Sequence, residues 1–419
     1  MRVLASAYAC EPDRGSEPGI GWNFARQIAL RHNLTLITRE NNVADIQRAV
    51  LEEGLNIEVI GHDLPRHLRF WKRGSRGAMA YYLLWQKSLA AVAQRVAQRS
   101  SFDVAHHLTF ASGWLPSGLV HTGLPFVFGP VGEHPRVPSE YLRPGDWRAR
   151  AAEALRATAR HQFPRIDPGV AATWKAADVI LSLGSTFGDR IPESHKDRIV
   201  PMLAAGTETE AFFAPTPRAE DQPLRCAFAG RLVDLKGIRT ALHAFAFAFA
   251  GGRETLAIYG DGPNRALLEE LVRVLGVADQ VQFHGHVDHS AAQEGMRAAD
   301  VFLFPSFEGA GMVVPEAMAA GACVVCLEFG GPGEMVGNTR GIAVPLGTCV
   351  EATAREIGKA LKNLAGDEAK RMELASKGHE WARRVTTWSA KGEMLEGVYQ
   401  RALTTHAERN DQRPRKEAV

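Results

Sequence analysis

Short apolar runs alternate with longer segments of helical character along most of the chain. The clearest runs in the first half cover residues 34–37, 57–60, 104–106, 125–128 and 179–181. A second series begins at Arg225 and continues to about Val344. Such alternation predicts βαβ units, and therefore an α/β fold built on parallel sheets.

The length of the chain predicts more than one domain. Its 419 residues exceed what a single hydrophobic core usually holds. Residues 201–206, followed by Pro215 and Pro217, have the composition of a linker. We therefore predict one domain over residues 1–203 and a second over residues 204–387. A final helix is expected over residues 388–404, and the polar, charged residues 405–419 are expected to be disordered.

Charge and cysteine content exclude some classes of protein. The formal net charge is only +2, which gives no support to bulk nucleic-acid binding. Cys323 and Cys326 form a CxxC inside a buried-strand pattern, without a second CxxC, so we interpret them as buried thiols. The first residues are expected to form a strand and no apolar stretch is long enough to span a membrane, so a cytoplasmic location is expected.

The stretch from Glu308 to Glu316 carries the most chemical information. It follows an apolar run, Val301–Phe304, and precedes a short segment of helix formers that ends at Gly321. A phosphate could rest on the backbone of such a loop while the two carboxylates accept hydrogen bonds from hydroxyl groups. Pro315 suits the first position of the helix. The alternative is an ordinary strand, loop and helix with a capping glutamate, and this fragment alone leaves both interpretations open.

The stretch resembles the E-x7-E segment of family 4 glycosyltransferases, which are retaining enzymes of the GT-B fold. The loop from Phe228 to Gly237 is similar to the loop whose Arg and Lys hold the donor diphosphate in that family. Residues 258–263 and 282–287 resemble, in the same order, a tight turn after a strand and the loop around the nucleotide base. The resemblance covers nearly all of residues 1 to 404. It implies two Rossmann-like domains facing across a cleft, with the C-terminal helix crossing back to the N-terminal domain.

The resemblance implies a set of residues that bind a nucleotide-sugar donor, such as a UDP- or GDP-sugar. Arg231 and Lys236 would hold the diphosphate, Glu316 the ribose and Glu308 the donor sugar. The sequence has no Asp-x-Asp, so we expect no metal. The expected catalytic residues are Glu308, Arg231, Lys236 and His134. The expected donor-binding residues are Gly19, Gly21, Gly230, Arg231, Lys236, Gly260, Asp261, His286, Val287, Glu308, Gly309, Ala310, Gly311, Met312, Val313 and Glu316.

The acceptor is expected in the N-terminal domain. The long Gly/Pro loop from Cys10 to Trp22 matches the family's loop after the first strand, although a bare surface loop is the alternative. Of His106 and His107, one is expected to face the cleft, and burial is the better interpretation for His107. Similar sequences often read Gly-Pro-Val-Gly-Gly-Gly-Glu in this segment. In this chain Glu133 and His134 follow directly after Gly132, which is earlier than the glutamate of that pattern. The expected acceptor-side residues are Glu17, His106, Glu133 and His134.

A basic and aromatic stretch lies between Asp63 and Asp103, where no acidic residue occurs. Membrane contact is the favoured interpretation for the loop from Arg66 to Arg76. For the helix that follows, with Tyr81, Tyr82 and Trp85, core packing is slightly favoured over an interfacial role. Residues 66–87 are thus a candidate contact with an anionic membrane.

The predicted function is transfer of a sugar, with retention, from a nucleotide-sugar to an acceptor hydroxyl. The expected acceptor is a glycan or a lipid-linked molecule in cell-surface polysaccharide or glycoconjugate synthesis, and no nucleic acid is expected as a partner. Two alternatives stay open: a nucleotide-sugar 2-epimerase of the same fold, and a non-catalytic membrane-surface protein. The sequence does not specify the sugar, the base or the acceptor.

Overall fold

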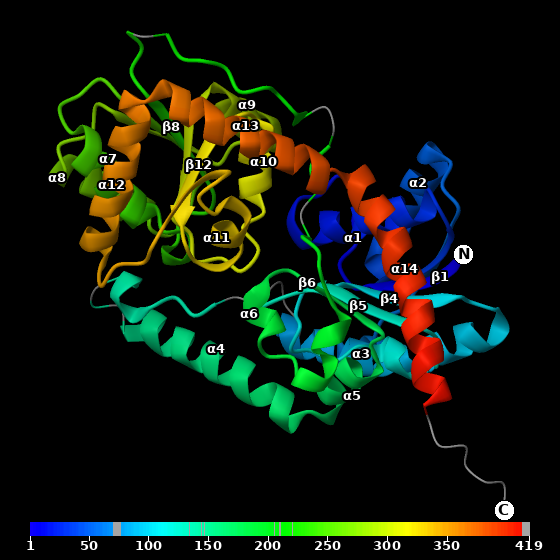
Figure 1. Ribbon diagram of the computed structural model, residues 1–419. Helices are drawn as coiled ribbons and strands as arrows, with labels where there is room; N and C mark the ends of the chain where they lie inside the picture. The colour runs from blue at the N-terminus through cyan, green and yellow to red at the C-terminus, as the bar shows by residue number, and fades with distance from the viewer. Residues whose placement is uncertain are drawn as a thin grey trace, which may run out of the picture. The chain divides into compact units, whose positions relative to one another are not determined.

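The computed structural model describes residues 1–69, 77–133, 135–143, 145, 147–204, 206–208, 211–219 and 221–412 (Figure 1). The chain divides into two compact units. Unit 1 comprises residues 1–133, 158–206 and 388–419, and unit 2 comprises residues 134–157 and 207–387.

Unit 1 is built on a seven-stranded parallel sheet with the strand order β3-β2-β1-β4-β5-β6-β7. Its strands are β1 (Arg2–Ala7), β2 (Asn33–Thr38), β3 (Ile57–Gly61), β4 (Val104–Thr109), β5 (Phe126–Val131), β6 (Val179–Ser182) and β7 (Ile199–Pro201). The helices that alternate with them or complete the unit are α1 (Ser16–Ala29), α2 (Val43–Glu53), α3 (Ala78–Arg99), α5 (Pro168–Ala176), α6 (Ser185–Gly188) and α14 (Trp388–Asp411). Helix α4 (Trp147–Ile166) belongs to unit 2 up to residue 157 and to unit 1 from residue 158. Because the central strands are covered on both faces, their side chains are almost all buried.

Unit 2 is built on a six-stranded parallel sheet with the strand order β10-β9-β8-β11-β12-β13. Its strands are β8 (Arg225–Ala229), β9 (Thr255–Tyr259), β10 (Val281–Gly285), β11 (Val301–Phe304), β12 (Cys323–Leu327) and β13 (Gly341–Val344). Its helices are α7 (Ile238–Phe249), α8 (Arg265–Val274), α9 (His289–Ala298), α10 (Val313–Ala319), α11 (Gly330–Val336), α12 (Val350–Gly366) and α13 (Glu368–Val385). The two parallel, Rossmann-like units confirm the predicted fold class.

In each sheet the strand order reverses beside the first strand of the unit. In unit 1 the chain runs outward from β1 to β3 and then returns to place β4 on the other side of β1. In unit 2 it runs from β8 to β10 and returns to place β11 beside β8. Ligands of open α/β sheets bind at such a switch point, outside the carboxyl ends of the strands. The fold therefore directs attention to the loops after β1 and β4 and to those after β8 and β11.

The division into units differs from the predicted domains at residues 134–157, which cluster with unit 2 although the prediction placed them in the first domain. Tyr141 explains part of this difference. Its hydroxyl donates to the carbonyl oxygen of Gly347 at 2.9 Å, and its ring packs on Phe307 with the centroids 5.0 Å apart. The backbone N–H of Arg143 donates to Asp234 Oδ2 at 3.1 Å. These non-local contacts carry no signal in the local sequence.

The expectation of disorder from residue 405 is wrong for residues 405–411, which continue helix α14. His406 Nδ1 lies 2.9 Å from Asp178 Oδ2, and Arg409 also pairs with that carboxylate. Asp178 is fully buried, so it requires partners of this kind. Residues 413–419 lie outside the described part of the chain. The helix itself belongs to unit 1, where it packs beside α1.

The aromatic side chains of α3 belong to the core of unit 1. Tyr81, Tyr82 and Trp85 are each at most 1% exposed, and they pack around Tyr8. The interfacial alternative is therefore wrong for these three rings. The rest of the proposed membrane loop, residues 70–76, lies outside the described residues.

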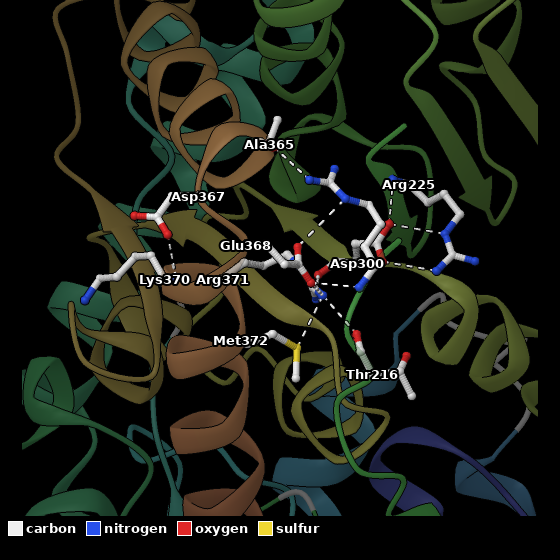
Figure 2. A network of polar contacts seen from close by, with 10 residues as sticks. Thr216, Arg225, Asp300, Ala365, Asp367, Glu368, Lys370, Arg371 and Met372 are labelled. Atoms are coloured by element: carbon white, nitrogen blue, oxygen red, sulfur yellow. Dashed lines mark hydrogen bonds and ion pairs between the residues drawn. The ribbon is translucent and has the colours of Figure 1, made fainter. Parts of the chain in front are cut away.

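A polar network holds the amino end of the unit 2 sheet (Figure 2). Arg371 is 1% exposed and donates to the carbonyl oxygens of Asp300 at 3.3 Å and Thr216 at 2.9 Å, while its Nε donates to Glu368 at 2.9 Å. Asp300 in turn accepts from the backbone N–H of Arg225 at 2.9 Å. Since β8 and β11 start at this network, it fixes the edge of the sheet opposite the switch-point loops.

Candidate functional site

The candidate site lies in unit 2, at the carboxyl ends of β8 and β11. The loop after β8 contains the turn Asp234–Lys236 and ends at Gly237, which caps helix α7. Gly237 has φ of +68°, and a Cβ atom there would lie 1.8 Å from the carbonyl oxygen of Pro305. Only glycine permits this close approach, so the β8 and β11 loops can lie directly against each other.

Hydrogen bonds join the same two loops. The backbone N–H of Phe307 donates to the carbonyl oxygen of Leu235 at 2.8 Å, and Ser306 Oγ donates to the same oxygen at 3.3 Å. The tethered loops bring Lys236 next to Glu308, with Lys236 Nζ 2.6 Å from Glu308 Oε1. Ser306 Oγ lies 3.3 Å from the other carboxylate oxygen. Two residues that the sequence separates widely therefore form one charged pair.

Arg231 stands at the start of the same loop with a different environment. Its side chain is exposed, and within the described chain its guanidinium has no hydrogen-bond or ion-pair partner. Lys236 and Glu308 are much less exposed, at 19% and 17% of their side chains. The site thus offers one unengaged fork-shaped cation and one cation already paired with a carboxylate. An arriving diphosphate would meet Arg231 first and compete with Glu308 for Lys236.

Glu316 is on α10, which begins at Val313 rather than at Pro315. Pro315 therefore occupies the third helical position and not the expected first. Because the N–H groups of the first helical turn have no acceptor within the helix, a proline at this position still costs no hydrogen bond. Burial raises the pKa of the Glu316 carboxyl, and the nearby charges of His289 and Lys236 oppose that shift. Within the described chain this carboxylate has no hydrogen-bond partner.

The turn after β9 lies directly against the β8 loop. A Cβ atom at Gly260 would lie 2.0 Å from the carbonyl oxygen of Gly230, and the Gly260 N–H donates to Gly285 O at 2.7 Å. The Asp261 carboxylate is engaged locally, because its Oδ1 accepts a hydrogen bond from the backbone N–H of Gly262 at 2.7 Å. The structure therefore brings Gly230, Arg231, Gly260 and Asp261 together, as expected for a donor site.

The loop after β10 borders the same edge of the sheet. The ring of His284 stacks on Tyr259, with centroids 4.5 Å apart and planes at 6°. His286 is exposed, Val287 is half-buried, and Asp288 caps helix α9 by accepting from Ala291 N. A flat, partly apolar surface of this kind suits a nucleotide base.

The glycine-rich start of α11 belongs to the site and was missed by the sequence analysis. A Cβ atom at Gly330 would lie 2.3 Å from the carbonyl oxygen of Glu308, and one at Gly331 would lie 2.3 Å from that of Gly309. Gly311 packs against Pro332 in the same way. The loop of Gly309, Ala310, Gly311, Met312 and Val313 is thereby held from behind. The run Gly-Gly-Pro-Gly at residues 330–333 was the available signal.

In unit 1 the corresponding switch point is occupied by Glu17, at the start of α1. Glu17 Oε1 accepts from the backbone N–H of Ala111 at 3.0 Å, which links the loops after β1 and β4. Its Oε2 is buried without a partner in the described chain. Burial raises the pKa of this carboxyl, while the Ala111 N–H lowers it. Gly19 and Gly21 pack against the backbone of this same loop, so these two expected donor-binding residues lie in a different unit from the others.

The expected acceptor role of His106 is wrong. Its side chain is 0% exposed, with Nδ1 2.8 Å from the Tyr399 hydroxyl and Nε2 2.7 Å from Gly129 O. Burial lowers its pKa to about 3, so it is a neutral core residue. His107 is equally buried, between Tyr82 and Ser117, as the favoured interpretation had it. Both imidazoles are buried in the core because β4 is a central strand of the sheet.

The structure describes Glu133 but not His134. The side chain of Glu133 is 5% exposed, and Glu133 Oε2 lies 2.7 Å from Arg190 Nε. Burial raises the pKa of this carboxyl and the charges of Arg190 and Arg160 lower it. An acceptor-side role for Glu133 stays a prediction. His134 lies outside the described residues, so its expected catalytic role is untested.

Residues 223–363, which include the whole candidate donor site, match the family described as Glycosyl transferases group 1. The 2-deoxystreptamine glucosyltransferase of Streptomyces kanamyceticus is 33% identical over 156 residues, which is 37% of this chain and 39% of that protein. The D-inositol 3-phosphate glycosyltransferase of Corynebacterium diphtheriae is 32% identical over 219 residues, 48% of this chain and 50% of that protein. The chain thus matches half or less of the length of these curated relatives.

The whole fold is similar to that of solved structures. The Anabaena protein HepE in complex with UDP superposes with a TM-score of 0.63 at 15% sequence identity, covering 96% of this chain and all of that one. The lipopolysaccharide-biosynthesis glycosyltransferase WaaG gives a TM-score of 0.58 at 17% identity, covering 94% of this chain and 99% of that one. At these identities the likeness to solved structures establishes the fold alone. The chain thus carries a group 1 glycosyltransferase domain over residues 223–363, and as a whole it has the GT-B fold.

Proposed function

We propose that the protein is a retaining glycosyltransferase that moves a sugar from a nucleotide-sugar donor to an acceptor hydroxyl. The observation that carries the proposal is the arrangement at the unit 2 switch point. There the two cations, Arg231 and Lys236, would neutralise the negative charge of a diphosphate. The carboxylates of Glu308 and Glu316 would accept hydrogen bonds from hydroxyl groups. A solved structure of the same fold, HepE, is in complex with UDP, which supports a nucleotide as the ligand.

In the proposed reaction, the bond between the anomeric carbon and the β-phosphate oxygen breaks, and the acceptor oxygen bonds to the anomeric carbon on the same face. The acceptor proton passes to the leaving phosphate oxygen. Negative charge grows on the diphosphate as the bond breaks, and the cations of Arg231 and Lys236 stabilise that charge. Glu308 accepts hydrogen bonds from the donor sugar, and Glu316 accepts them from the ribose.

The charge of the diphosphate is proposed to be neutralised without a metal. In the part of the chain that the structure describes, no group of three or more His, Cys, Asp or Glu side chains could hold a metal ion. The proposal itself rests on the two cations at the loop between Gly230 and Gly237. Activity that persists in EDTA supports it, and activity that EDTA abolishes and magnesium restores refutes it.

The acceptor is proposed to be a glycan or a lipid-linked molecule of cell-surface polysaccharide or glycoconjugate synthesis. Two of the relatives are named for polyhydroxylated acceptors, 2-deoxystreptamine and inositol 3-phosphate. We place the acceptor in unit 1, near the buried Glu17 carboxylate at its switch point. No helix among the described residues is long and apolar enough to cross a membrane. A cytoplasmic location, with peripheral contact to the membrane, is part of the proposal.

Calorimetric titration with UDP-, GDP- and ADP-glucose, with and without magnesium, tests the donor site. Replacing Lys236 by alanine removes one charged hydrogen bond and should weaken nucleoside diphosphate binding by about 1.5–3 kcal/mol. Lys359→Ala is the matched control, because Lys359 is an exposed lysine of the same unit that pairs with Glu356. Equal affinities of Lys236→Ala and wild type would refute the assignment. Sugar turnover that needs no acceptor would indicate the alternative function, a nucleotide-sugar 2-epimerase.

A further inference from the structure

Arg39 of unit 1 is a half-buried cation without a counter-charge. It follows directly after strand β2, and its Nε is buried without a hydrogen-bond partner. Within the described chain its guanidinium forms no hydrogen bond and no ion pair. Taking a cation partly out of water without pairing it costs free energy. A buried polar atom of this kind therefore indicates a ligand that is still to be identified.

The register of the sheet determines where Arg39 lies. The last paired residues of β1 and β2 are Ala7 and Thr38. Tyr8 and Arg39 come next, so they leave two adjacent parallel strands at the same edge of the sheet. This is the carboxyl edge, which also contains the switch point of unit 1. Asn42 holds the corner, because its Nδ2 donates to Tyr8 O at 3.2 Å and to Thr38 Oγ1 at 3.0 Å.

Two buried aromatic rings support the guanidinium. Its central carbon lies 5.0 Å from the centroid of the Tyr8 ring and 5.9 Å from that of Tyr81. Both tyrosines are in the core of unit 1, so this support is rigid. A cation that is already positioned on aromatic rings loses little conformational freedom when it binds an anion.

The carboxylates of this corner are engaged by other groups. Glu40 Oε2 lies 2.9 Å from Arg69 Nη2, and Asp63 Oδ1 accepts from the Tyr81 hydroxyl at 2.5 Å. The second oxygen of Asp63 lies 3.9 Å from Arg69 Nη1. Residues 64–102 contain no acidic residue, so the chain after Asp63 supplies no further counter-charge. Among the described residues of this corner, Arg39 is thus the cation that is available to an external anion.

A short series of contacts joins Arg39 to the carboxylate of Glu17. The ring of Tyr8 packs on Phe110, with the centroids 4.9 Å apart. The next residue, Ala111, donates its N–H to Glu17 Oε1. Both groups therefore belong to the same edge of the unit 1 sheet. One is a carboxylate that suits hydroxyl groups, and the other is a guanidinium that suits an anion.

We propose that Arg39 binds an anionic group of the acceptor, which is a phosphate or a carboxylate. The proposal rests on the proposed function, because it takes unit 1 as the acceptor-binding unit. A guanidinium presents two parallel N–H groups to such an anion, and partial burial strengthens the interaction. Arg39 then selects the acceptor by its charge, and the binding of the donor does not involve it.

Calorimetric titration with inorganic phosphate, glucose 6-phosphate, glucuronate and glucose tests this assignment. The protein is first saturated with the nucleoside diphosphate that it binds, so that Arg231 and Lys236 are occupied. Arg39→Met should then weaken binding of the anions about 10- to 100-fold, since a charged hydrogen-bonding group is lost. Glucose should not distinguish this variant from wild type. Tighter binding of the phosphates or of glucuronate identifies the anionic group as a phosphate or a carboxylate.

The matched control is Arg48→Met, at an exposed arginine of α2 that pairs with Asp45. It should bind all four probes as wild type does. Thermal unfolding separates a binding role of Arg39 from a structural one. Arg39→Met should unfold at the same temperature as wild type or higher, because it removes an unpaired and partly buried cation. Phosphate should raise the unfolding temperature of wild type more than that of Arg39→Met.

Three results would overturn the proposal while leaving the proposed function intact. The first is equal affinity of wild type and Arg39→Met for all three anions. The second is weaker nucleoside diphosphate binding by Arg39→Met, which would assign Arg39 to the donor. The third is a lower unfolding temperature of Arg39→Met, which would give Arg39 a structural role. Failure of wild type to bind any nucleoside diphosphate would instead refute the proposed function, and this inference with it.

Discussion

Lys236 Nζ lies 2.6 Å from Glu308 Oε1, although the two residues are expected to hold different parts of the donor. Without ligand they neutralise each other in a largely buried position. If Lys236 binds the diphosphate as proposed, the diphosphate has to displace this carboxylate first. The ion pair would then hold Lys236 in position and lower its affinity for the diphosphate.

Glu308→Gln should bind free UDP or GDP as tightly as wild type or more tightly, because Lys236 loses its competing partner. Turnover of the nucleotide-sugar should fall by one or more orders of magnitude, since the donor sugar loses a charged hydrogen-bond acceptor. Calorimetry gives the affinities and a product assay gives kcat. Glu328→Gln, at an exposed position after β12, is the control and should change neither quantity. Weaker nucleotide binding by Glu308→Gln would contradict the competition.

Glu316→Gln should behave differently from Glu308→Gln. If Glu316 accepts from the ribose, its loss weakens free nucleoside diphosphate and nucleotide-sugar by the same amount, about 1.5–3 kcal/mol. The same titrations measure this for both ligands. Indistinguishable binding and kinetic profiles for the two variants would show that the glutamates do not have the separate roles proposed here.

Lys391 makes stability depend on pH. It is 1% exposed, its Nζ donates to Leu203 O, and burial lowers its pKa to about 7. An unfolded lysine has a pKa near 10.4, so between about pH 7 and 10.4 the unfolded chain binds a proton that the folded chain does not. Stability due to this group therefore rises with pH across that window, and the full penalty is present below it.

Lys391→Met removes the penalty and should unfold at a higher temperature than wild type at pH 7, by more than about 2 °C. The lost hydrogen bond to Leu203 offsets only about 1 kcal/mol. Differential scanning fluorimetry at pH 7, 8.5 and 10 should show the advantage shrinking as the pH rises. Lys377→Met, at an exposed lysine of α13, should show no such trend. An advantage that is constant or grows with pH would be the wrong sign for this mechanism.

Arg371→Met should destabilise unit 2 by about 3–5 kcal/mol, because Glu368 loses its buried partner and two backbone carbonyls lose a donor. Lys370→Met is the natural control. Lys370 is adjacent in sequence but 51% exposed, and its pair with Glu373 is worth less than about 1 kcal/mol. Urea unfolding measures both, and comparable losses would show that the network in Figure 2 is not the source of stability.

Arg409→Ala should cost about 2–3 kcal/mol, since buried Asp178 would keep only His406 and the backbone N–H of Phe126 as partners. Glu408→Ala, at the exposed neighbouring position of the same helix, should cost less than about 0.5 kcal/mol. Thermal unfolding of the two variants checks whether the end of α14 anchors unit 1. A harmless Arg409→Ala would mean that it does not.

The local sequence determined the parts of the molecule that depend on short-range chemistry. Apolar runs such as Val301–Phe304 specify strands, and loops such as Gly230–Gly237 must follow a strand and precede a helix. Since the carboxyl ends of parallel strands share one edge of a sheet, these loops had to meet. The donor roles of Arg231, Lys236, Glu308 and Glu316 were implied by the resemblance to family 4 glycosyltransferases, and they stay a prediction.

Tertiary structure decided everything that depends on partners far away in the chain. His106 looks like a site residue in sequence, but Tyr399, 293 positions later, completes its burial. Residues 405–411 look like a disordered tail until Asp178 gives His406 and Arg409 a buried counter-charge. Local pattern specifies which element forms, whereas the desolvation and pairing of a side chain depend on neighbours that only the folded chain brings together.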